Sequence, residues 1–254
     1  TGLLRNEKFR KMNLSFVKGY FGGAAPLPED TLSQLRQLHG AIIYDVYGAT
    51  ENTAFATVTP WGGKVKFGTV GVPLPGTDIK IVDLDTGTRE LPPKEAGEIC
   101  IKGPQVMSGY YKKPEETAQA LKDGWFYTGD IGFFDEDGYL TISDRKKDMI
   151  CASGFNIYPK EVDEILFGHP KILEACCIGV PDEYRGETVK AYVVVQPGET
   201  LTEQEVIAYC KGKMTGYKVP TQVEFIDQLP KSAIGKIMRR EVRDMDKKKR
   251  EGRS

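Results

Sequence analysis

Residues 144–162 read Asp-Arg-Lys-Lys-Asp-Met-Ile-Cys-Ala-Ser-Gly-Phe-Asn-Ile-Tyr-Pro-Lys-Glu-Val, and they separate two parts of the chain. A predicted strand that ends at 141–143 runs into five consecutive charged residues, 144–148, which no strand could bury. A short apolar run and a Gly-containing turn follow. A helix is predicted to begin at Pro159, because proline fits best at the first helical position. Charge runs usually mark exposed chain. We therefore expect either a solvated linker or a pivot at 145–147.

The chain before this stretch begins with a predicted strand–helix–strand unit in residues 1–61. Residues 14–22 are expected to form a buried strand, a helix should run from Pro28 to Leu38, and residues 41–47 form a second apolar strand. This order implies a parallel βαβ unit, in which ligands bind at the carboxyl ends of the strands. Gly-Gly-Ala-Ala-Pro at 22–26 and Tyr-Gly-Ala-Thr-Glu at 47–51 lie at those ends.

The rest of the chain predicts two further kinds of structure. Residues 62–144 contain short strands with closely spaced turn signals, which favour a small β-barrel subdomain. Residues 148–254 read as an α+β domain, in which Thr202 should cap a helix with Glu205 three residues later. Its expected elements are a helix at 159–167, strands at 172–180 and 187–196, a helix at 202–213, a strand at 221–226 and a terminal helix. The fold class is therefore mixed: a βαβ remnant of an α/β domain, a β-barrel and a hinged C-terminal α+β domain.

Composition excludes several classes of function. The 254 residues carry a formal net charge of −1 with both signs interspersed, which argues against nucleic acid as a partner. No apolar run is long enough to cross a bilayer, so no transmembrane segment is expected. The five cysteines lie in apolar patterns without a C-x-x-C pair, and we expect them to be buried and unpaired in a reducing, cytoplasmic compartment. Oligomeric state is left open.

Several separated segments resemble the motifs of one enzyme superfamily. Residues 144–162 resemble the hinge segment of the adenylate-forming acyl-CoA synthetases, the ATP-dependent AMP-binding enzymes, and in particular their fatty-acid-activating branch. Tyr-Gly-Ala-Thr-Glu at 47–51 resembles their Tyr-Gly-x-Thr-Glu segment. The remaining matches are Gly-Glu at 97–98 with the loop to 111, Thr-Gly-Asp at 128–130, and the catalytic-lysine loop at 230–236. These motifs occur in the family's order.

The resemblance implies a two-step reaction. ATP converts an acid, here a medium- or long-chain fatty acid, to an acyl-adenylate with Mg²⁺, and the thiol of coenzyme A then displaces AMP. By this resemblance Tyr47 stacks on adenine, Gly48 gives close backbone approach, and Thr50 binds the α-phosphate. Glu51 holds Mg²⁺, a cation that prefers carboxylate and phosphate oxygen.

Further roles follow from the same resemblance. Ala24 and Ala25 match the small residues between adenine and the acyl group, and Asp130 matches the acceptor for the ribose hydroxyls. Arg145 should reach the ribose or phosphate from the hinge. Each of two residues also has a simpler interpretation. Thr50 could cap its own loop, and Asp130 could be a turn aspartate that binds only its own backbone.

The C-terminal part supplies the residues implied for switching between the two steps. Lys236 is expected to enter the site and neutralise charge during adenylation. Rotation at the hinge residue, Lys147, should then withdraw Lys236 and bring Gly154 against the pantetheine arm of coenzyme A. Position 151 is Cys in this chain, whereas several branches of the family carry there a lysine used in the second step. We therefore assign Cys151 no catalytic role. Other branches of the family have aspartate at the position of Lys147. This difference does not identify the substrate.

The sequence also lacks one motif. The family's phosphate loop, rich in Ser, Thr and Gly and ending in Pro-Lys-Gly, is not found, and the chain opens at Thr1. We therefore expect the latter half of a synthetase, inactive alone. An aryl-CoA ligase, an amino-acid-adenylating module and a non-catalytic nucleotide-binding module remain alternatives.

Overall fold

The chain divides into two compact units. The computed structural model describes all residues except 1–3, 5, 24–28, 41, 233–234 and 253–254. One unit comprises Thr1–Ile142 and the other Ser143–Ser254. This division lies close to the predicted hinge at 145–147, and movement about the hinge stays a prediction.

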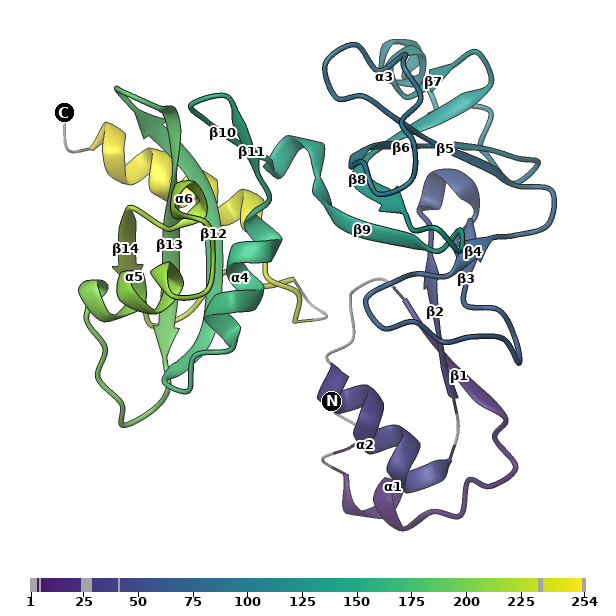
Figure 1. The fold of residues 1–254 in the computed structure, drawn as a ribbon, viewed down its shortest axis with the longest axis horizontal. Coiled ribbons are helices and arrows are strands. Elements are labelled where there is room, and N and C mark those ends of the chain that lie inside the picture. Colours follow the sequence, from purple (N-terminus) through teal and green to yellow (C-terminus); the bar gives the residue numbers. More distant parts are fainter. Residues whose placement is uncertain (1–3, 5, 24–28, 41, 233–234, 253–254) are drawn as a thin grey trace. The chain divides into compact units, whose positions relative to one another are not determined.

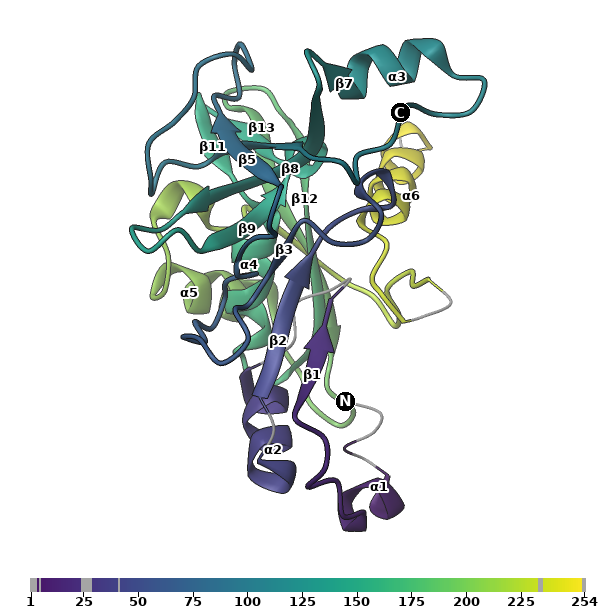
Figure 2. The ribbon, with the colours of Figure 1, turned by 90° about the vertical axis from the view of Figure 1, so that its right-hand side faces the viewer.

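The first unit begins with the predicted strand–helix–strand order. After helix α1 (Glu7–Lys11), strand β1 (Gly19–Gly22), helix α2 (Glu29–His39) and strand β2 (Ile42–Tyr47) follow one another. Strands β1 and β2 are parallel and lie side by side in both ribbon views (Figures 1 and 2). Strands β3 (Thr57–Val58) and β4 (Val72–Pro73) extend this sheet in the order β1-β2-β3-β4.

The predicted buried strand at 14–22 is wrong in length and in burial. Strand β1 covers only Gly19–Gly22, and the Phe16 and Phe21 side chains are exposed. The reason is that β1 is the edge strand of the described sheet and pairs with β2 alone. The ring of Phe21 instead contacts the ring of Tyr44, and the two ring centroids are 5.8 Å apart.

The second part of this unit is a half-barrel rather than a closed barrel. Its antiparallel sheet has the order β5-β6-β8-β7, and β9 pairs with β8. Its elements are β5 (Asp78–Val82), β6 (Gly97–Lys102), α3 (Pro114–Ala120), β7 (Leu121–Lys122), β8 (Trp125–Phe134) and β9 (Leu140–Arg145). Its apolar face, with Ile99 and Phe126, packs on the neighbouring sheet through Tyr47 of β2 and through Ala56 and Val70, which lie in the loops next to its short strands. Because that sheet covers the apolar face, the half-barrel does not need to close on itself.

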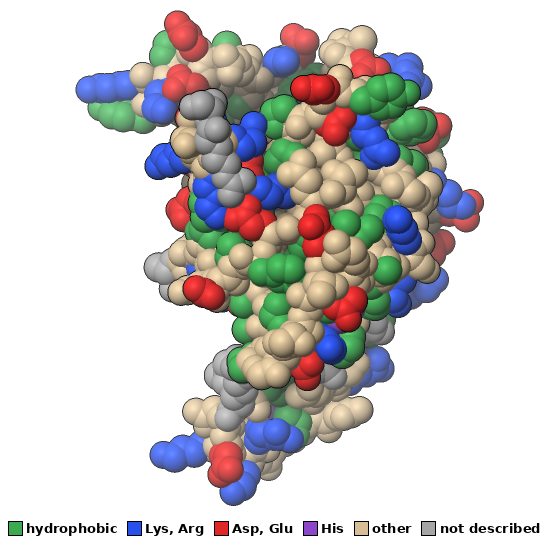
Figure 3. Space-filling model, turned by 90° about the vertical axis from the view of Figure 1, so that its left-hand side faces the viewer, with side chains coloured by type: hydrophobic (Ala, Val, Ile, Leu, Met, Phe, Trp, Pro, Cys, Tyr) green, Lys and Arg blue, Asp and Glu red, His purple; other side chains and the backbone are tan. Residues whose placement is uncertain are grey.

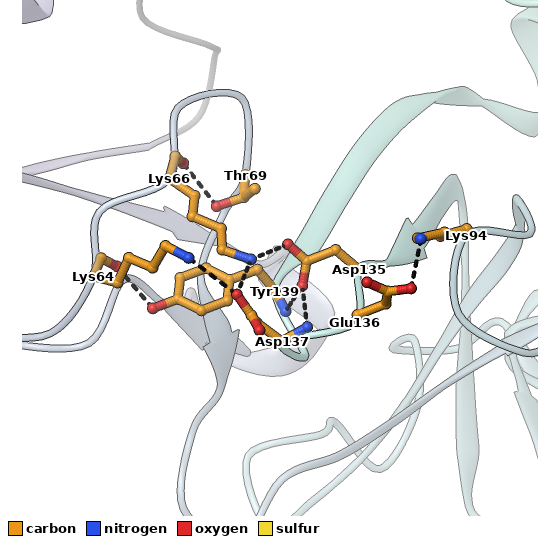
Figure 4. A network of polar contacts seen from close by, with 8 residues as sticks. All are labelled: Lys64, Lys66, Thr69, Lys94, Asp135, Glu136, Asp137 and Tyr139. Carbon is orange, nitrogen blue, oxygen red and sulfur yellow. Dashed lines mark hydrogen bonds and ion pairs between the residues drawn. The ribbon is translucent and has the colours of Figure 1, made fainter.

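A polar network fastens the β8–β9 turn to the loop before β4 (Figure 4). The Lys66 ammonium lies between the carboxylates of Asp135 and Asp137 and 4.6 Å above the Tyr139 ring. Asp135 also accepts the backbone N–H groups of Asp137 and Tyr139, each at 2.9 Å. The turn is therefore held both by its own backbone and by a lysine from a distant part of the chain.

The second unit has helices on both faces of one sheet, in the order β11-β10-β13-β12 with β14 beside β13. Helices α4 and α5 cover one face through Val162, Leu166 and Val206, and α6 covers the other through Val242. The elements are β10 (Ile150–Ala152), β11 (Phe155–Ile157), α4 (Pro159–Phe167), β12 (Ile172–Asp182), β13 (Gly186–Val195), α5 (Glu203–Lys211), β14 (Gln222–Phe225) and α6 (Arg239–Glu251). Short 3₁₀ turns cover Thr50–Asn52, Lys146–Asp148 and Gly216–Lys218.

Most elements predicted for this unit are confirmed. Pro159 is the first residue of α4. The capping box is present at α5, where Glu205 N–H donates to Thr202 Oγ1 at 3.3 Å and Thr202 N–H donates to Glu205 Oε2 at 2.8 Å. The cysteines are free, but the prediction that all are buried is wrong for Cys151, which is exposed. It lies in the short β10–β11 hairpin, where its side chain points away from the core.

Two further observations concern the charges on the surface and the length of the helices. On the face shown in Figure 3, basic and acidic side chains are interspersed. Within the described part of the chain, no helix is long and apolar enough to cross a membrane.

Candidate functional site

The structure distributes the predicted site residues over both units. Tyr47, Gly48, Thr50, Glu51 and Asp130 belong to Thr1–Ile142. A second set belongs to Ser143–Ser254, namely Arg145, Lys147, Gly154 and Lys236. Ala24 and Ala25 lie outside the described residues.

The first set is brought together by a contact between two motifs. The Tyr47 hydroxyl, at the carboxyl end of β2, donates to Asp130 Oδ2 at 2.8 Å. These residues are 83 positions apart in the sequence. Asp130 therefore does more than bind its own backbone, and its side chain lies at the end of the parallel strand pair, where the βαβ order predicts a ligand.

Thr-Gly-Asp at 128–130 lies within strand β8 and not in a separate turn. The pairing of β6 with β8 shifts register between Glu98 and Cys100, and Gly129 has φ +70°, a conformation that favours glycine. Glu98, which is buried, accepts the Gly129 N–H at 3.1 Å. The Thr128 hydroxyl accepts the Asp130 N–H at 3.0 Å. Glu98 therefore fixes the irregular backbone that presents Asp130, a role that the Gly-Glu motif did not reveal on its own.

The loop after β2 is tightly closed on itself. A Cβ atom at position 48 would lie 2.0 Å from the Ala54 carbonyl oxygen, so only glycine fits there. Asn52 Oδ1 accepts the Ala49 N–H at 2.6 Å, and Thr50 makes no side-chain cap of this turn. Thr53 and Ala54 have φ values of 55° and 79°, which are unusual for residues other than glycine. Such strain is often found at functional sites.

Glu51 is held by a residue that sequence reasoning did not assign to the site. The Tyr110 hydroxyl donates to Glu51 Oε1 at 2.7 Å, and the Met107 N–H donates to the Glu51 carbonyl oxygen at 2.7 Å. Burial and the hydrogen bond to Glu51 raise the pKa of Tyr110 to about 12, so this tyrosine is a neutral donor at pH 7. The signal was present in the sequence, because Tyr110 lies in Ser-Gly-Tyr-Tyr at 108–111, the end of the loop that follows Gly-Glu at 97–98 in the matched motif.

These residues fit a nucleotide with Mg²⁺. Within the described residues, no group of three or more His, Cys, Asp or Glu side chains could hold a metal ion. Mg²⁺ is commonly bound by one or two carboxylates together with substrate phosphates. Glu51 offers one such carboxylate, oriented by Tyr110. A single protein carboxylate therefore suits Mg²⁺ that is bound together with the phosphates of a nucleotide. It does not suit a metal site formed by protein side chains alone.

The second unit presents its predicted residues on loops. Lys236 is exposed and lies in a closed loop, where its carbonyl oxygen accepts the Ser232 N–H at 2.9 Å. Gly154, with φ +81°, is exposed in the turn between β10 and β11. Arg145 and Lys147 are exposed at the start of the unit.

The expectation that residues 144–148 cannot be buried is wrong for two of the five. Asp144, near the end of strand β9, and Asp148 are buried with exposed fractions of 5% and 9%. The physical reason is that Arg239 and Arg243 of α6 form ion pairs with these carboxylates. The sequence around the hinge carries no sign of these partners, which follow about a hundred residues later.

Comparison with known proteins places the chain in a family. A model of the AMP-binding enzymes matches residues 2–111, and a model of the AMP-binding enzyme C-terminal domain matches residues 161–236. A long-chain-fatty-acid–CoA ligase of Escherichia coli O6:H1 is 43% identical over 95% of this chain and 43% of its own length. A 2-succinylbenzoate–CoA ligase of Geobacillus kaustophilus is 40% identical over 87% of this chain and 44% of its own length.

A solved structure shows the same fold. ATP-bound MatB from Rhodopseudomonas palustris matches with a TM-score of 0.82 and 37% identity, over 89% of this chain and 45% of that one. The chain thus spans less than half the length of the relatives that it matches. By the two family models and these relatives, the chain belongs to the AMP-binding enzymes, the adenylate-forming superfamily.

Proposed function

We propose that the chain is the C-terminal part of an AMP-forming acid–thiol ligase that activates a fatty acid with ATP and transfers it to coenzyme A. One observation carries this proposal. Tyr47 and Glu51 of the motif at 47–51 are hydrogen-bonded to Asp130 and Tyr110, which come from two other motifs. Similarity to long-chain-fatty-acid–CoA ligases supports a medium- or long-chain fatty acid as the substrate.

Each residue of the first unit has a role that its chemistry suits. The Tyr47 ring offers adenine a stacking face while its hydroxyl holds Asp130, whose carboxylate can accept the ribose hydroxyls. Thr50 offers a hydroxyl to the α-phosphate, and Glu51 offers Mg²⁺ a hard oxygen. Mg²⁺, when bound, neutralises phosphate charge. Ala24 and Ala25 are proposed to leave room between adenine and the acyl group.

The residues of the second unit are proposed to serve the two half-reactions in turn. The Lys236 ammonium stabilises the charge on the transferring phosphate and on the carboxylate during adenylation. Arg145 binds the ribose or phosphate. Rotation at Lys147 then withdraws Lys236 and places Gly154 beside the thiol-bearing arm of coenzyme A. Domain movement about a few hinge residues, far from most of the chemistry, is an established form of gating in enzymes.

An aryl acid is the second candidate substrate. The relative named 2-succinylbenzoate–CoA ligase is nearly as similar, at 40% identity, as the fatty-acid ligases at 43–45%. The residues assigned above are proposed to bind the nucleotide, and they do not discriminate between acyl groups.

The test uses the complete protein that contains this chain. Adenylation is measured by pyrophosphate exchange with medium-chain and long-chain fatty acids, benzoate and 2-succinylbenzoate, each with ATP and Mg²⁺. We expect the highest kcat/KM with a fatty acid, followed by thioester formation when coenzyme A is added. A higher kcat/KM with an aryl acid would overturn the substrate assignment. No exchange with any acid would overturn the proposed reaction.

A further inference from the structure

Helix α3 of the half-barrel contacts the loop that carries Tyr110, the tyrosine whose hydroxyl holds Glu51. The helix begins at Pro114 and ends at Ala120, and strand β7 follows directly. Leu121 of β7 packs on the apolar core and pairs with Phe126 of β8. The C-terminal end of α3 is therefore attached to the core of the half-barrel.

The contact between the helix and the loop is made by Thr117. Its hydroxyl donates to the Lys113 carbonyl oxygen at 2.7 Å and accepts the Tyr110 N–H at 2.9 Å. One hydroxyl can make both bonds, because it has one hydrogen and two lone pairs. The bond to Lys113 is ordinary for a helical threonine, which often binds the carbonyl group four residues earlier. The bond to Tyr110 is different, because it holds a residue outside the helix.

The backbone of the loop passes close to Thr117. Gly109 has φ +152°, a conformation that favours glycine, and a Cβ atom at this position would lie 2.8 Å from Thr117 Cγ2. The Tyr110 carbonyl oxygen accepts the Lys113 N–H at 3.2 Å. The N–H and C=O groups of Tyr110 are thus bound, the first to Thr117 and the second to the turn before α3.

On another side the loop borders a surface hollow. The hollow has a volume of about 590 Å³, and its lining includes Tyr110, Tyr111, Pro114, Thr117 and Leu121. Packing therefore does not hold Tyr110 in place from this side. The hydrogen bonds of its backbone take on that task.

The side chain of Tyr110 extends to the candidate metal site. Its hydroxyl donates to Glu51 Oε1 at 2.7 Å, and the Met107 N–H donates to the Glu51 carbonyl oxygen at 2.7 Å. The bond from Met107 fixes the main chain of Glu51, whereas the bond from Tyr110 directs its carboxylate. The direction of this carboxylate therefore depends on where the backbone of Tyr110 lies.

We propose that Thr117 is a positioning residue for the Glu51 carboxylate and acts through Tyr110. The Thr117 hydroxyl fixes the backbone of Tyr110, and the Tyr110 hydroxyl then orients Glu51 toward Mg²⁺. The role of Glu51 as a ligand of Mg²⁺ rests on the proposed function, whereas the contact between Thr117 and the Tyr110 loop does not.

The contact itself is tested by hydrogen–deuterium exchange in the complete protein. Thr117→Val removes the hydroxyl and keeps the branched shape, while Thr117→Ser keeps the hydroxyl. Glu115→Gln, at an exposed position of the same helix, is the control. Amides of residues 108–113 should exchange about fivefold faster in Thr117→Val and normally in the other two variants. Unchanged exchange in Thr117→Val would overturn the proposal.

The effect on the metal site is measured as binding and as rate. In Thr117→Val, the affinity for Mn²⁺ in the presence of ATP should fall about fivefold by calorimetry, and Thr117→Ser should restore it. The Mg²⁺ concentration that gives half-maximal pyrophosphate exchange should rise by the same factor. The kcat at saturating Mg²⁺ should stay nearly unchanged, because Thr117 orients a metal ligand and contacts no substrate. A loss of kcat that added Mg²⁺ does not restore would overturn the positioning role.

A double-mutant cycle decides whether Thr117 acts through Tyr110. In the Tyr110→Phe background, Thr117→Val should change the Mn²⁺ affinity by less than about twofold, because the hydroxyl that Thr117 positions is already absent. A full fivefold effect in that background would contradict the proposal. If Thr117→Val does not fold, Thr117→Ala is judged by the same criteria. Failure of both to fold would also overturn the proposal, since Thr117 would then serve the fold as a whole.

These measurements separate the inference from the proposed function. If the complete protein adenylates no acid but Thr117→Val lowers its Mn²⁺ affinity as expected, the proposed reaction fails and the positioning of Glu51 is supported. If the protein is active and Thr117→Val leaves the Mn²⁺ affinity unchanged, the positioning role fails and the proposed reaction stands. If the unmodified protein binds no Mn²⁺ with ATP, the metal role of Glu51 fails, and the positioning role fails with it.

Discussion

At the scale of single residues, the pairing of Glu51 with Tyr110 makes a sharp prediction. A hydrogen bond to a charged group typically contributes about 1.5–3 kcal/mol. Tyr110→Phe in the complete enzyme removes this donor from Glu51 and keeps the ring. We therefore expect adenylation to fall about tenfold or more and to require a higher Mg²⁺ concentration, as measured by pyrophosphate exchange over a Mg²⁺ series.

The neighbouring tyrosine is the control for this prediction. Tyr111 is 85% exposed, so Tyr111→Phe should leave both the rate and the Mg²⁺ dependence unchanged. Mn²⁺ binding to the two variants, followed by calorimetry in the presence of ATP, provides a readout that does not depend on turnover. Equal Mn²⁺ affinity in Tyr110→Phe and the unmodified enzyme would argue against an orienting role for Tyr110.

Asp83 makes a prediction about pH. Its carboxylate accepts the backbone N–H of Thr86 at 2.7 Å and of Arg89 at 2.8 Å, and these bonds, led by that of Thr86, hold the pKa of Asp83 well below its usual range. A lowered pKa in the folded state means that the ionised group stabilises the fold above its ordinary pKa. That contribution is lost as the pH falls toward the folded-state value.

The measurement compares melting temperatures across pH. Asp83→Asn should lower the Tm of the first unit at pH 7. This difference should shrink only in part at about pH 3, where Asp83 is protonated in the unfolded chain but still ionised in the folded one, and it should shrink further at lower pH. Asp85→Asn, at an exposed position of the same turn, should have little effect at either pH. A Tm difference that does not change with pH would contradict the charge-based explanation.

At the scale of elements, the network around Lys66 should stabilise the half-barrel. The Lys66 side chain is 19% exposed and joins the loop before β4 to the β8–β9 turn, whereas the Lys94–Glu136 pair nearby is largely exposed (Figure 4). Exposed ion pairs contribute little, and partly buried networks contribute more. Lys66→Met should therefore lower the Tm of the first unit by about 2–4 °C, and Lys94→Met by much less.

The salt dependence provides a second check on this element. Added salt screens exposed charges more than partly buried ones. The effect of Lys66→Met on the Tm should therefore persist at high ionic strength, while any effect of Lys94→Met should vanish. If both variants behave alike in low and high salt, the network around Lys66 has no special role in fastening the turn.

The elements also show what a sequence can predict. Helices α4 and α5 and strands β12 and β13 follow from local signals: a proline at the start of α4, a capping box at α5 and apolar strands with buried faces. The half-barrel was predicted as a small β-barrel, because the spacing of turns indicates how many strands there are but not what covers their apolar face. That cover comes from Ala56 and Val70, which precede the half-barrel in the chain.

At the scale of the whole molecule, the unpredicted features of the candidate site are contacts between distant segments. The burial of Asp144 and Asp148 depends on Arg239 and Arg243, and the arrangement of Asp130 depends on Glu98. No local pattern marks a charged residue as buried when its partner is far away. The motifs identified Tyr47, Glu51 and Asp130, whereas their supporting residues could be recognised only in three dimensions.

The proposed two-step reaction predicts that Lys236 serves one half-reaction only. In the complete enzyme, Lys236→Ala should lower adenylation about 10²–10³-fold, because one preorganised cation no longer balances the transferring charge. Thioester formation from supplied acyl-AMP should continue almost unchanged, since Lys236 would by then have been withdrawn. Lys231→Ala, in the same loop but with its ammonium bound to Glu174, is the control and should spare both steps.

Lys147→Pro should produce the opposite separation. Proline fixes φ near −65°, so it can hold the hinge in one conformation. Adenylation should then proceed while the thiol step is blocked, because Gly154 is not brought to the pantetheine arm. Single-turnover assays of each half-reaction measure both variants. Equal damage to both steps by Lys236→Ala would mean that the lysine supports the loop structure. Normal thioester formation by Lys147→Pro would mean that the hinge does not turn at Lys147.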